Sequence, residues 1–123
     1  RQTEGAKILK RISRQRRKAL KRQLPATLTA EDWLFVLSEF GNKCCYCGEE
    51  VEVLTQDHFI PVTKYGEYVM GNILPSCPRC NTSKLNHDFF EWYPRQPYYS
   101  KLREKKILKF VNQFQIIQQR VLF

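Results

Sequence analysis

The chain has 123 residues, of which 42% are hydrophobic and 27% charged, and its formal net charge at pH 7 is +9. This length fits one domain with a single modest core. No apolar run approaches the roughly 20 residues that a membrane span needs, which argues against a membrane protein. The basic N-terminus has no apolar stretch behind it, so we expect no secretory signal and an intracellular location.

The positive charge is concentrated at the N-terminus. Residues 1–22 contain ten Lys or Arg and one acid, whereas the remainder of the chain contains 11 basic and 11 acidic residues. A cationic segment of this kind suits a polyanion such as nucleic acid, and the alternatives are a solvated charged helix or a targeting tail. The candidate phosphate contacts in this segment are Arg11, Arg14, Arg16, Arg17, Lys18, Lys21 and Arg22.

Helical periodicity predicts a first helix over residues 5–24. Its isoleucines and leucines form a narrow apolar stripe, the rest of its surface is cationic, and Pro25 ends it. We therefore expect a basic helical arm, residues 1–24, followed by a second unit, residues 25–123.

A second helix is predicted over residues 30–40. Thr29 is a good N-cap, Asp32 follows three residues later in a position that resembles a capping box, and Gly41 ends the helix. Its broad apolar face indicates a core helix.

The middle of the chain predicts a hairpin followed by a short helix. A strand over residues 54–60 leads into a loop over 61–71 and a return strand over 72–75, and Pro78 lies in the first turn of the helix that follows. The last helix is predicted over residues 101–121. Helix therefore outweighs strand, and we expect an α+β, mainly helical fold.

Four of the five cysteines form two Cys-x-x-Cys pairs that are 29 residues apart. Their number and spacing favour one structural zinc site over disulfides, and the alternative is a group of buried free thiols. A four-thiolate site leaves no position open for substrate, so its role would be to stabilise the fold. Its ligands would be Cys44, Cys47, Cys77 and Cys80, and Cys45 is out of register with both pairs.

Asp57 and His58 stand together at the end of the first predicted strand. A carboxylate supplies a hard oxygen ligand for a metal ion, and a neutral imidazole can accept a proton near pH 7. Taken alone, such a pair is more often structural than catalytic.

The order of the motifs gives this pair a context. From Cys44 to Lys84 the chain reads Cys-x-x-Cys, Asp-His-x-x-Pro, Asn-Ile and Cys-x-x-Cys-Asn-x-x-Lys. This pattern, which covers about a third of the chain, resembles the HNH endonuclease family. Residues 89–93 also resemble small phage-type members of the family. The resemblance implies a ββα-metal (His-Me finger) core over about residues 44–86, with a structural zinc site and flanking helices.

The resemblance also implies a role for four polar residues. Asp57 corresponds to the first metal ligand, and Asn81 stands where many members of the family have a histidine as the second ligand. His58 corresponds to the general base that activates water. Asn72 corresponds to the asparagine whose amide fixes the loop across the hairpin. Because Asp57 and Asn81 both offer oxygen, we expect Mg²⁺ or Mn²⁺ as the catalytic cofactor.

The activity implied is metal-dependent hydrolysis of DNA phosphodiester bonds, with nicking by a single site. Further candidate phosphate contacts are Lys84, Arg79 and Lys64. Two alternatives stay open: a catalytically silent zinc-knuckle DNA-binding module and an RNA-directed nuclease. We expect duplex or branched DNA as the partner and no membrane, in a bacterial cytoplasm or the host cell of a phage, and the choice between monomer and homodimer stays open.

Overall fold

The computed structural model describes residues 3–21, 24–114 and 116, without the side chains of residues 20 and 21. Two candidate phosphate contacts, the Lys21 side chain and Arg22, lie outside the described residues. The part of the predicted C-terminal helix after residue 116 also lies outside them.

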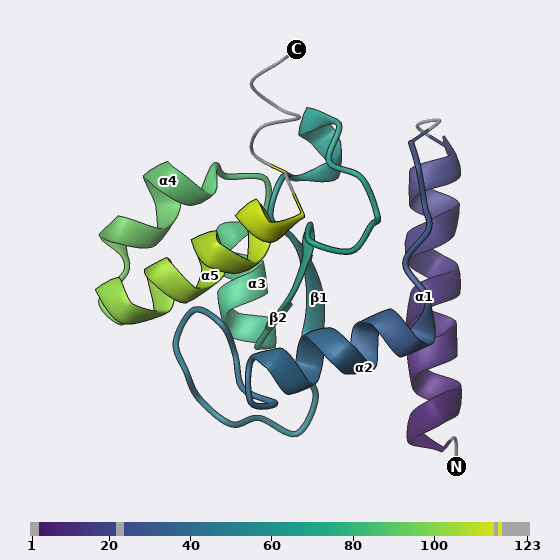
Figure 1. Cartoon of the computed structure of the whole chain (residues 1–123), viewed down its shortest axis with the longest axis horizontal. Coiled ribbons are helices and arrows are strands. Elements are labelled where there is room, and N and C mark those ends of the chain that lie inside the picture. Colours follow the sequence, from purple (N-terminus) through teal and green to yellow (C-terminus); the bar gives the residue numbers. More distant parts are fainter. Residues whose placement is uncertain (1–2, 22–23, 115, 117–123) are drawn as a thin grey trace.

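An antiparallel hairpin forms the centre of the molecule (Figure 1). Strand β1 (Thr55–His58) pairs with β2 (Ile73–Ser76) so that Thr55 faces Ser76 and His58 faces Ile73. Helix α3 (Pro78–Lys84) follows β2 directly and packs against β1. This strand, loop, strand and helix order is the one that the sequence predicts, but β1 is shorter than the predicted strand over 54–60, and β2 has the predicted length and is shifted by one residue.

Helix α2 (Ala30–Glu39) begins as its capping pattern predicts. Asp32 N donates to Thr29 Oγ1 at 3.1 Å, and Thr29 N donates to the Asp32 carboxylate at 3.0 Å, which completes a capping box. The helix buries Trp33 and Val36 and packs against β2. It therefore covers one side of the hairpin, as a core helix should.

The helices that follow α3 lie on another side of the hairpin (Figure 1). A short helix α4 (Phe89–Trp92) and a 3₁₀ turn (Tyr93–Arg95) lead to α5 (Lys101–Gln113), which Ser100 caps. Helical periodicity did not predict α4, because one turn is too short to show a period. The aromatic residues of this region are mainly core, as Trp92 and Tyr93 are both buried.

Helix α1 (Glu4–Lys21) packs on the body instead of standing apart from it. Its apolar stripe buries Ile8, Ile12 and Ala19. Arg11 Nη1 also donates to the Leu54 carbonyl oxygen at 2.8 Å. Figure 1 shows α1 on the side of the hairpin away from α4 and α5.

The described residues form five α-helices and one two-stranded antiparallel sheet, which makes the fold α+β and about half helical. Within these ranges, no helix combines the length and the apolar character needed to cross a bilayer. The division of the chain at residue 24 stays a prediction.

Candidate active site and metal centre

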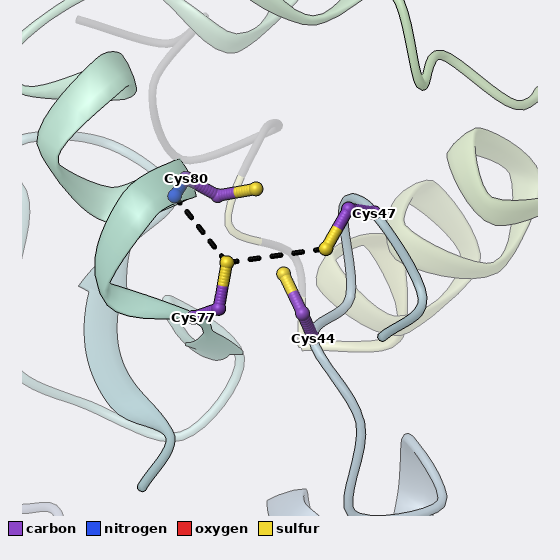
Figure 2. Close-up of side chains that lie close together, drawn as sticks. All are labelled: Cys44, Cys47, Cys77 and Cys80. Atoms are coloured by element: carbon purple, nitrogen blue, oxygen red, sulfur yellow. Dashed lines mark hydrogen bonds between the residues drawn. The ribbon is translucent and has the colours of Figure 1, made fainter. Parts of the chain in front are cut away.

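Four thiols meet at one point beside the hairpin (Figure 2). Cys44 and Cys47 come from the loop before β1, and Cys77 and Cys80 come from the start of α3. The four sulfur atoms lie within 4.8 Å of one another, and the Sγ atoms of Cys47 and Cys77 are 3.9 Å apart. Zinc–sulfur bonds of ~2.3 Å in a tetrahedron separate the sulfurs by roughly 3.8 Å, so the cluster can hold a metal ion.

The electrostatics of the cluster also suit a metal ion. A hydrogen bond from Cys80 is the largest of the effects that lower the pKa of Cys44 to about 4. The same contact raises the pKa of Cys80. Metals bind the thiolate form of cysteine. The spare Cys45 is buried away from this group, and its backbone N–H donates to the Pro75 carbonyl oxygen at 2.9 Å.

Two contacts join α3 to one face of β1. Asn81 Nδ2 donates to Thr55 Oγ1 at 3.0 Å, and Lys84 Nζ lies 3.3 Å from Asp57 Oδ2. Residues 55 and 57 share a face of the strand because strand side chains alternate, and residues 81 and 84 share a side of the helix. The fold therefore brings Asn81 and Asp57 to facing surfaces.

Asp57 is deeply buried, with 4% of its surface exposed. Its carboxylate accepts a hydrogen bond from the Tyr46 hydroxyl and pairs with the Lys84 ammonium. Burial raises the pKa of Asp57, and Lys84 and Tyr46 oppose that rise. The charge of Asp57 is thus kept inside the protein by two neighbours that the motif did not assign to it.

Lys84 corrects one of the predicted roles. The sequence placed it among the candidate phosphate contacts, with an exposed helix lysine as the alternative. The structure buries its side chain completely, and its Nζ donates to the His58 carbonyl oxygen at 2.8 Å as well as to Asp57. Its ammonium is therefore not available to a phosphate in this structure. The cause is the buried carboxylate of Asp57, which requires a cation nearby.

His58 ends β1 and is half-buried. Burial and the positive charges of Lys84 and Lys18 lower its pKa to about 4. The imidazole is therefore neutral near pH 7, which is the form that accepts a proton. Its ring centroid lies 6.0 Å from that of Tyr68.

Asn72 fixes the loop that follows β1. Its Oδ1 accepts from Ile60 N at 2.8 Å, and its Nδ2 donates to the carbonyl oxygens of Ile60 at 3.2 Å and Glu67 at 2.8 Å. At Gly66 this loop passes so close to Ile60 that a Cβ would lie 1.6 Å from the Ile60 carbonyl oxygen. These bonds run from Asn72, directly before β2, to the loop after His58, and the role that the motif implies for Asn72 stays a prediction.

Other predicted phosphate contacts are spread over the surface. Arg79 is exposed and lies 3.8 Å from Glu49, and Lys64 is half-buried in the loop between the strands. Arg16 Nη2 donates to the Leu28 carbonyl oxygen at 2.9 Å. The basic side chains that α1 leaves exposed include Arg14, Arg17 and Lys18.

Sequence reasoning missed the residues that support the turn between Cys44 and Cys47. The Tyr46 carbonyl oxygen accepts from Tyr93 Oη and from Arg103 Nε, both at 2.7 Å. Arg103 lies more than fifty positions away in the chain, so no local pattern connects it to that turn. The signal in the sequence was Tyr46 itself, an aromatic residue between Cys44 and Cys47.

Comparison with known proteins supports the motif reading. Residues 44–87 match the family model for the HNH endonuclease. The SPbeta prophage-derived protein YoqL of Bacillus subtilis (strain 168), which carries an HNH endonuclease name, is 32% identical over 98 residues. The Septu protein PtuB of Bacillus thuringiensis is 41% identical over 61 residues, and protein ea31 of Escherichia phage lambda is 38% identical over 56 residues.

These relatives are longer than the chain. The matches cover 71%, 45% and 44% of this chain but 43%, 24% and 19% of YoqL, PtuB and ea31. The chain therefore spans less than half the length of each. The resemblance predicted from the spacing of the motifs is confirmed, and it supports a nuclease. Residues 44–87 are therefore the part of this chain that is similar to the HNH endonuclease family.

Proposed function

We propose that the protein is a metal-dependent DNA endonuclease that hydrolyses phosphodiester bonds and nicks one strand at a time. The observation that carries this proposal is the meeting of α3 and β1, where Asn81 contacts Thr55 on the face that bears Asp57, directly before His58. The match to the HNH family supports the reaction class.

Asp57 and Asn81 are the residues that would hold the catalytic ion, Mg²⁺ or Mn²⁺. They fit in kind, because a carboxylate and a carboxamide both offer the hard oxygens that these ions prefer. Their placement is supported by the contact of Asn81 with Thr55, which shares a face of β1 with Asp57. When bound, the ion would stabilise negative charge on the cleaved phosphate and the leaving 3′ oxygen. Asp57 would then share its carboxylate between the ion, Tyr46 and Lys84.

His58 acts as the general base in this proposal. Its neutral imidazole accepts a proton from the attacking water, whose oxygen bonds to phosphorus while the bond to the 3′ oxygen breaks. The products would carry a 5′-phosphate and a 3′-hydroxyl group. Asn72 and Lys84 position this base, since both bind the backbone at or just after His58.

The four cysteines would hold one Zn²⁺ as a structural ion. Thiolate ligands in this number are typical of structural zinc sites. This ion would tie the loop of Cys44 and Cys47 to the start of α3. The basic face of α1 would add phosphate contacts that give affinity without sequence recognition.

The test is conversion of supercoiled plasmid to open circle, with Mg²⁺, with Mn²⁺ and with neither. His58→Ala should lower the rate by about 10²-fold or more, as expected for loss of a general base. His87→Ala is the matched control, because His87 is the other histidine of the chain and is exposed.

Each other outcome points to a different function. A wild-type protein that binds the plasmid but never cuts it would be a silent zinc-knuckle DNA-binding module. A protein that leaves the plasmid intact and cuts a labelled RNA hairpin would be an RNA-directed nuclease. Equal loss of activity in the two histidine variants would refute the role given to His58.

A further inference from the structure

A pocket of about 230 Å³ lies between α1 and β1, beside the candidate active site. Three basic residues of α1, namely Arg11, Arg14 and Lys18, line one wall. Thr55, Gln56 and Asn81 line the other wall, and none of the lining residues is acidic. Its volume is below the roughly 300–1,000 Å³ of typical small-molecule pockets, so it suits a small group.

Gln56 supplies a hydrogen-bond donor without a partner at this wall. The residue is 5% exposed, and its Oε1 accepts from the Tyr68 hydroxyl at 2.8 Å. Its Nε2 has no hydrogen-bond partner, and among the described residues it is the one buried side-chain nitrogen or oxygen in that state. Buried polar groups are nearly always paired, so an unpaired donor on a residue that lines a pocket points to an acceptor atom that the described residues do not supply.

The charged groups that line the pocket are all basic, which favours an anion as the ligand. Arg11 is already engaged, since its guanidinium donates to the Leu54 carbonyl oxygen and lies 3.4 Å from Glu4. Arg14 and Lys18 are exposed at the other positions of the same wall. A ligand here lies beside two cations and a residue with an unpaired amide N–H, and a phosphate group accepts hydrogen bonds from donors of these kinds.

The pocket also adjoins the residues proposed for catalysis. Asn81, a proposed metal ligand, lines it and donates to Thr55 across its floor. A group bound in this pocket is therefore next to the reacting centre.

We propose that this pocket binds one backbone phosphate of the nucleic acid strand, adjacent to the phosphate that is cleaved. The proposal rests on the proposed function in taking nucleic acid as the substrate and His58 as the place of cleavage, whereas binding of a phosphate in the pocket does not depend on cleavage. Such a contact sets the register of the strand over His58 and reads no sequence. It also distinguishes Arg14 and Lys18 from exposed basic residues of α1 outside the pocket, such as Arg17, which would contact the backbone without a fixed position.

Two arginines of α1 test this distinction. Arg14 lines the pocket, whereas Arg17 is exposed on the same helix and does not line it. Binding of a fluorescein-labelled DNA duplex would be measured by anisotropy without added divalent ions, for Arg14→Gln and Arg17→Gln. Arg14→Gln should weaken binding about tenfold or more, as expected for loss of a charge-assisted hydrogen bond. Arg17→Gln should weaken it less than about threefold, as expected for a solvated contact.

Gln56→Glu tests the buried donor with little change of shape. The new carboxylate can still accept from Tyr68 but replaces the amide donor with a negative charge. Gln113→Glu is the control, since it makes the same charge change at an exposed position of α5. Gln56→Glu should weaken binding about tenfold more than its control does. A urea unfolding curve for each variant would show that the variants compared are folded.

A single neutral methylphosphonate, moved along one strand, would identify the phosphate that is bound. In the wild type one position should weaken binding most, and Arg14→Gln should lose no further affinity at that position, because effects on one contact are not additive. Equal effects of Arg14→Gln and Arg17→Gln would overturn the pocket proposal even if the plasmid is nicked. Equal effects of Gln56→Glu and Gln113→Glu would overturn it too. Absence of nicking with these differences intact would refute the proposed function and leave the phosphate pocket standing.

Discussion

Lys84 and Asp57 form an ion pair inside the protein, with Nζ 3.3 Å from Oδ2 and side-chain exposures of 0% and 4%. Lys84 also donates to the His58 carbonyl oxygen at 2.8 Å. One helix residue therefore neutralises the strand carboxylate and holds the backbone of the residue proposed as general base. The Lys at the end of the Cys-x-x-Cys-Asn-x-x-Lys motif acts from inside the fold, between α3 and β1.

Lys84→Met should destabilise the protein by about 3–5 kcal/mol, because it leaves the Asp57 carboxylate buried without its cation. Urea unfolding of the metal-loaded protein, followed by tryptophan fluorescence, would measure the loss. Arg79→Gln is the control, since its pair with Glu49 is exposed and should be worth about 0–1 kcal/mol. A Lys84→Met variant as stable as this control would contradict the buried pair.

The double variant Asp57→Asn with Lys84→Met gives a sharper outcome. Removing both charges takes away the unpaired group, so the double variant should be more stable than Lys84→Met alone. Mn²⁺ binding, followed by electron paramagnetic resonance, would give a second readout. If Asp57 is a metal ligand, Mn²⁺ should stabilise Lys84→Met and should not stabilise the double variant.

Removal of a metal ion from the four-cysteine cluster should unfold the two Cys-x-x-Cys segments that form it. Apparent binding energies of roughly 10–16 kcal/mol for zinc in such sites match or exceed the 5–15 kcal/mol stability of a whole domain. A strong chelator should therefore abolish the near-ultraviolet circular dichroism of the buried aromatic residues around Tyr46. A metal-free protein with native spectra would argue against the structural role.

The fifth cysteine supplies the control for the metal site. Cys80→Ser should lower the zinc content from one ion per chain, measured by atomic absorption, because Cys80 belongs to the cluster. Cys45→Ser should keep the full content, since Cys45 is buried outside it. Loss of zinc in both variants would indicate that Cys45 takes part.

The sequence predicted the elements that are determined by local chemistry. The capping pair at Thr29 starts α2, Ser100 starts α5, and the two Cys-x-x-Cys pairs meet in one cluster. Each of these features depends on residues a few positions apart or on a spacing specific to metal sites. Helix α4 and the packing of α1 depend on aromatic and aliphatic contacts across the chain, which no local period reveals.

The candidate site likewise combines residues that the motif singled out with neighbours that it could not reveal. The motif singled out Asp57, His58 and Asn81 as candidates, because those residues are recognised by type and order. It did not show that Tyr46 and Lys84 enclose the Asp57 carboxylate, since burial is decided by how α3 packs on β1. A charged side chain in a helix reads as exposed unless its partner is known.

Asn72→Ala should lower the rate of nicking more than it weakens Mn²⁺ binding. The substitution leaves Ile60 N–H and two carbonyl groups without partners, so the loop after His58 loses its fixed position. The metal ligands proposed here do not contact Asn72 in the described hydrogen bonds. Cleavage rates at saturating Mn²⁺, together with Mn²⁺ titration, would separate the two effects. A larger loss of affinity than of rate would count against a positioning role.

Ile12→Ala tests whether α1 belongs to the folded body or is a separable arm. Ile12 is 3% exposed within the core, whereas Leu9 on the same helix is 59% exposed. If α1 is part of the cooperative fold, Ile12→Ala should cost about 2–5 kcal/mol of unfolding free energy. Leu9→Ala should then change it by less than about 0.5 kcal/mol. If both variants unfold at the wild-type urea concentration, α1 docks without supporting the core, and the chain divides near residue 24. An equal loss in both would instead mean that helix propensity, not burial, sets the contribution of α1.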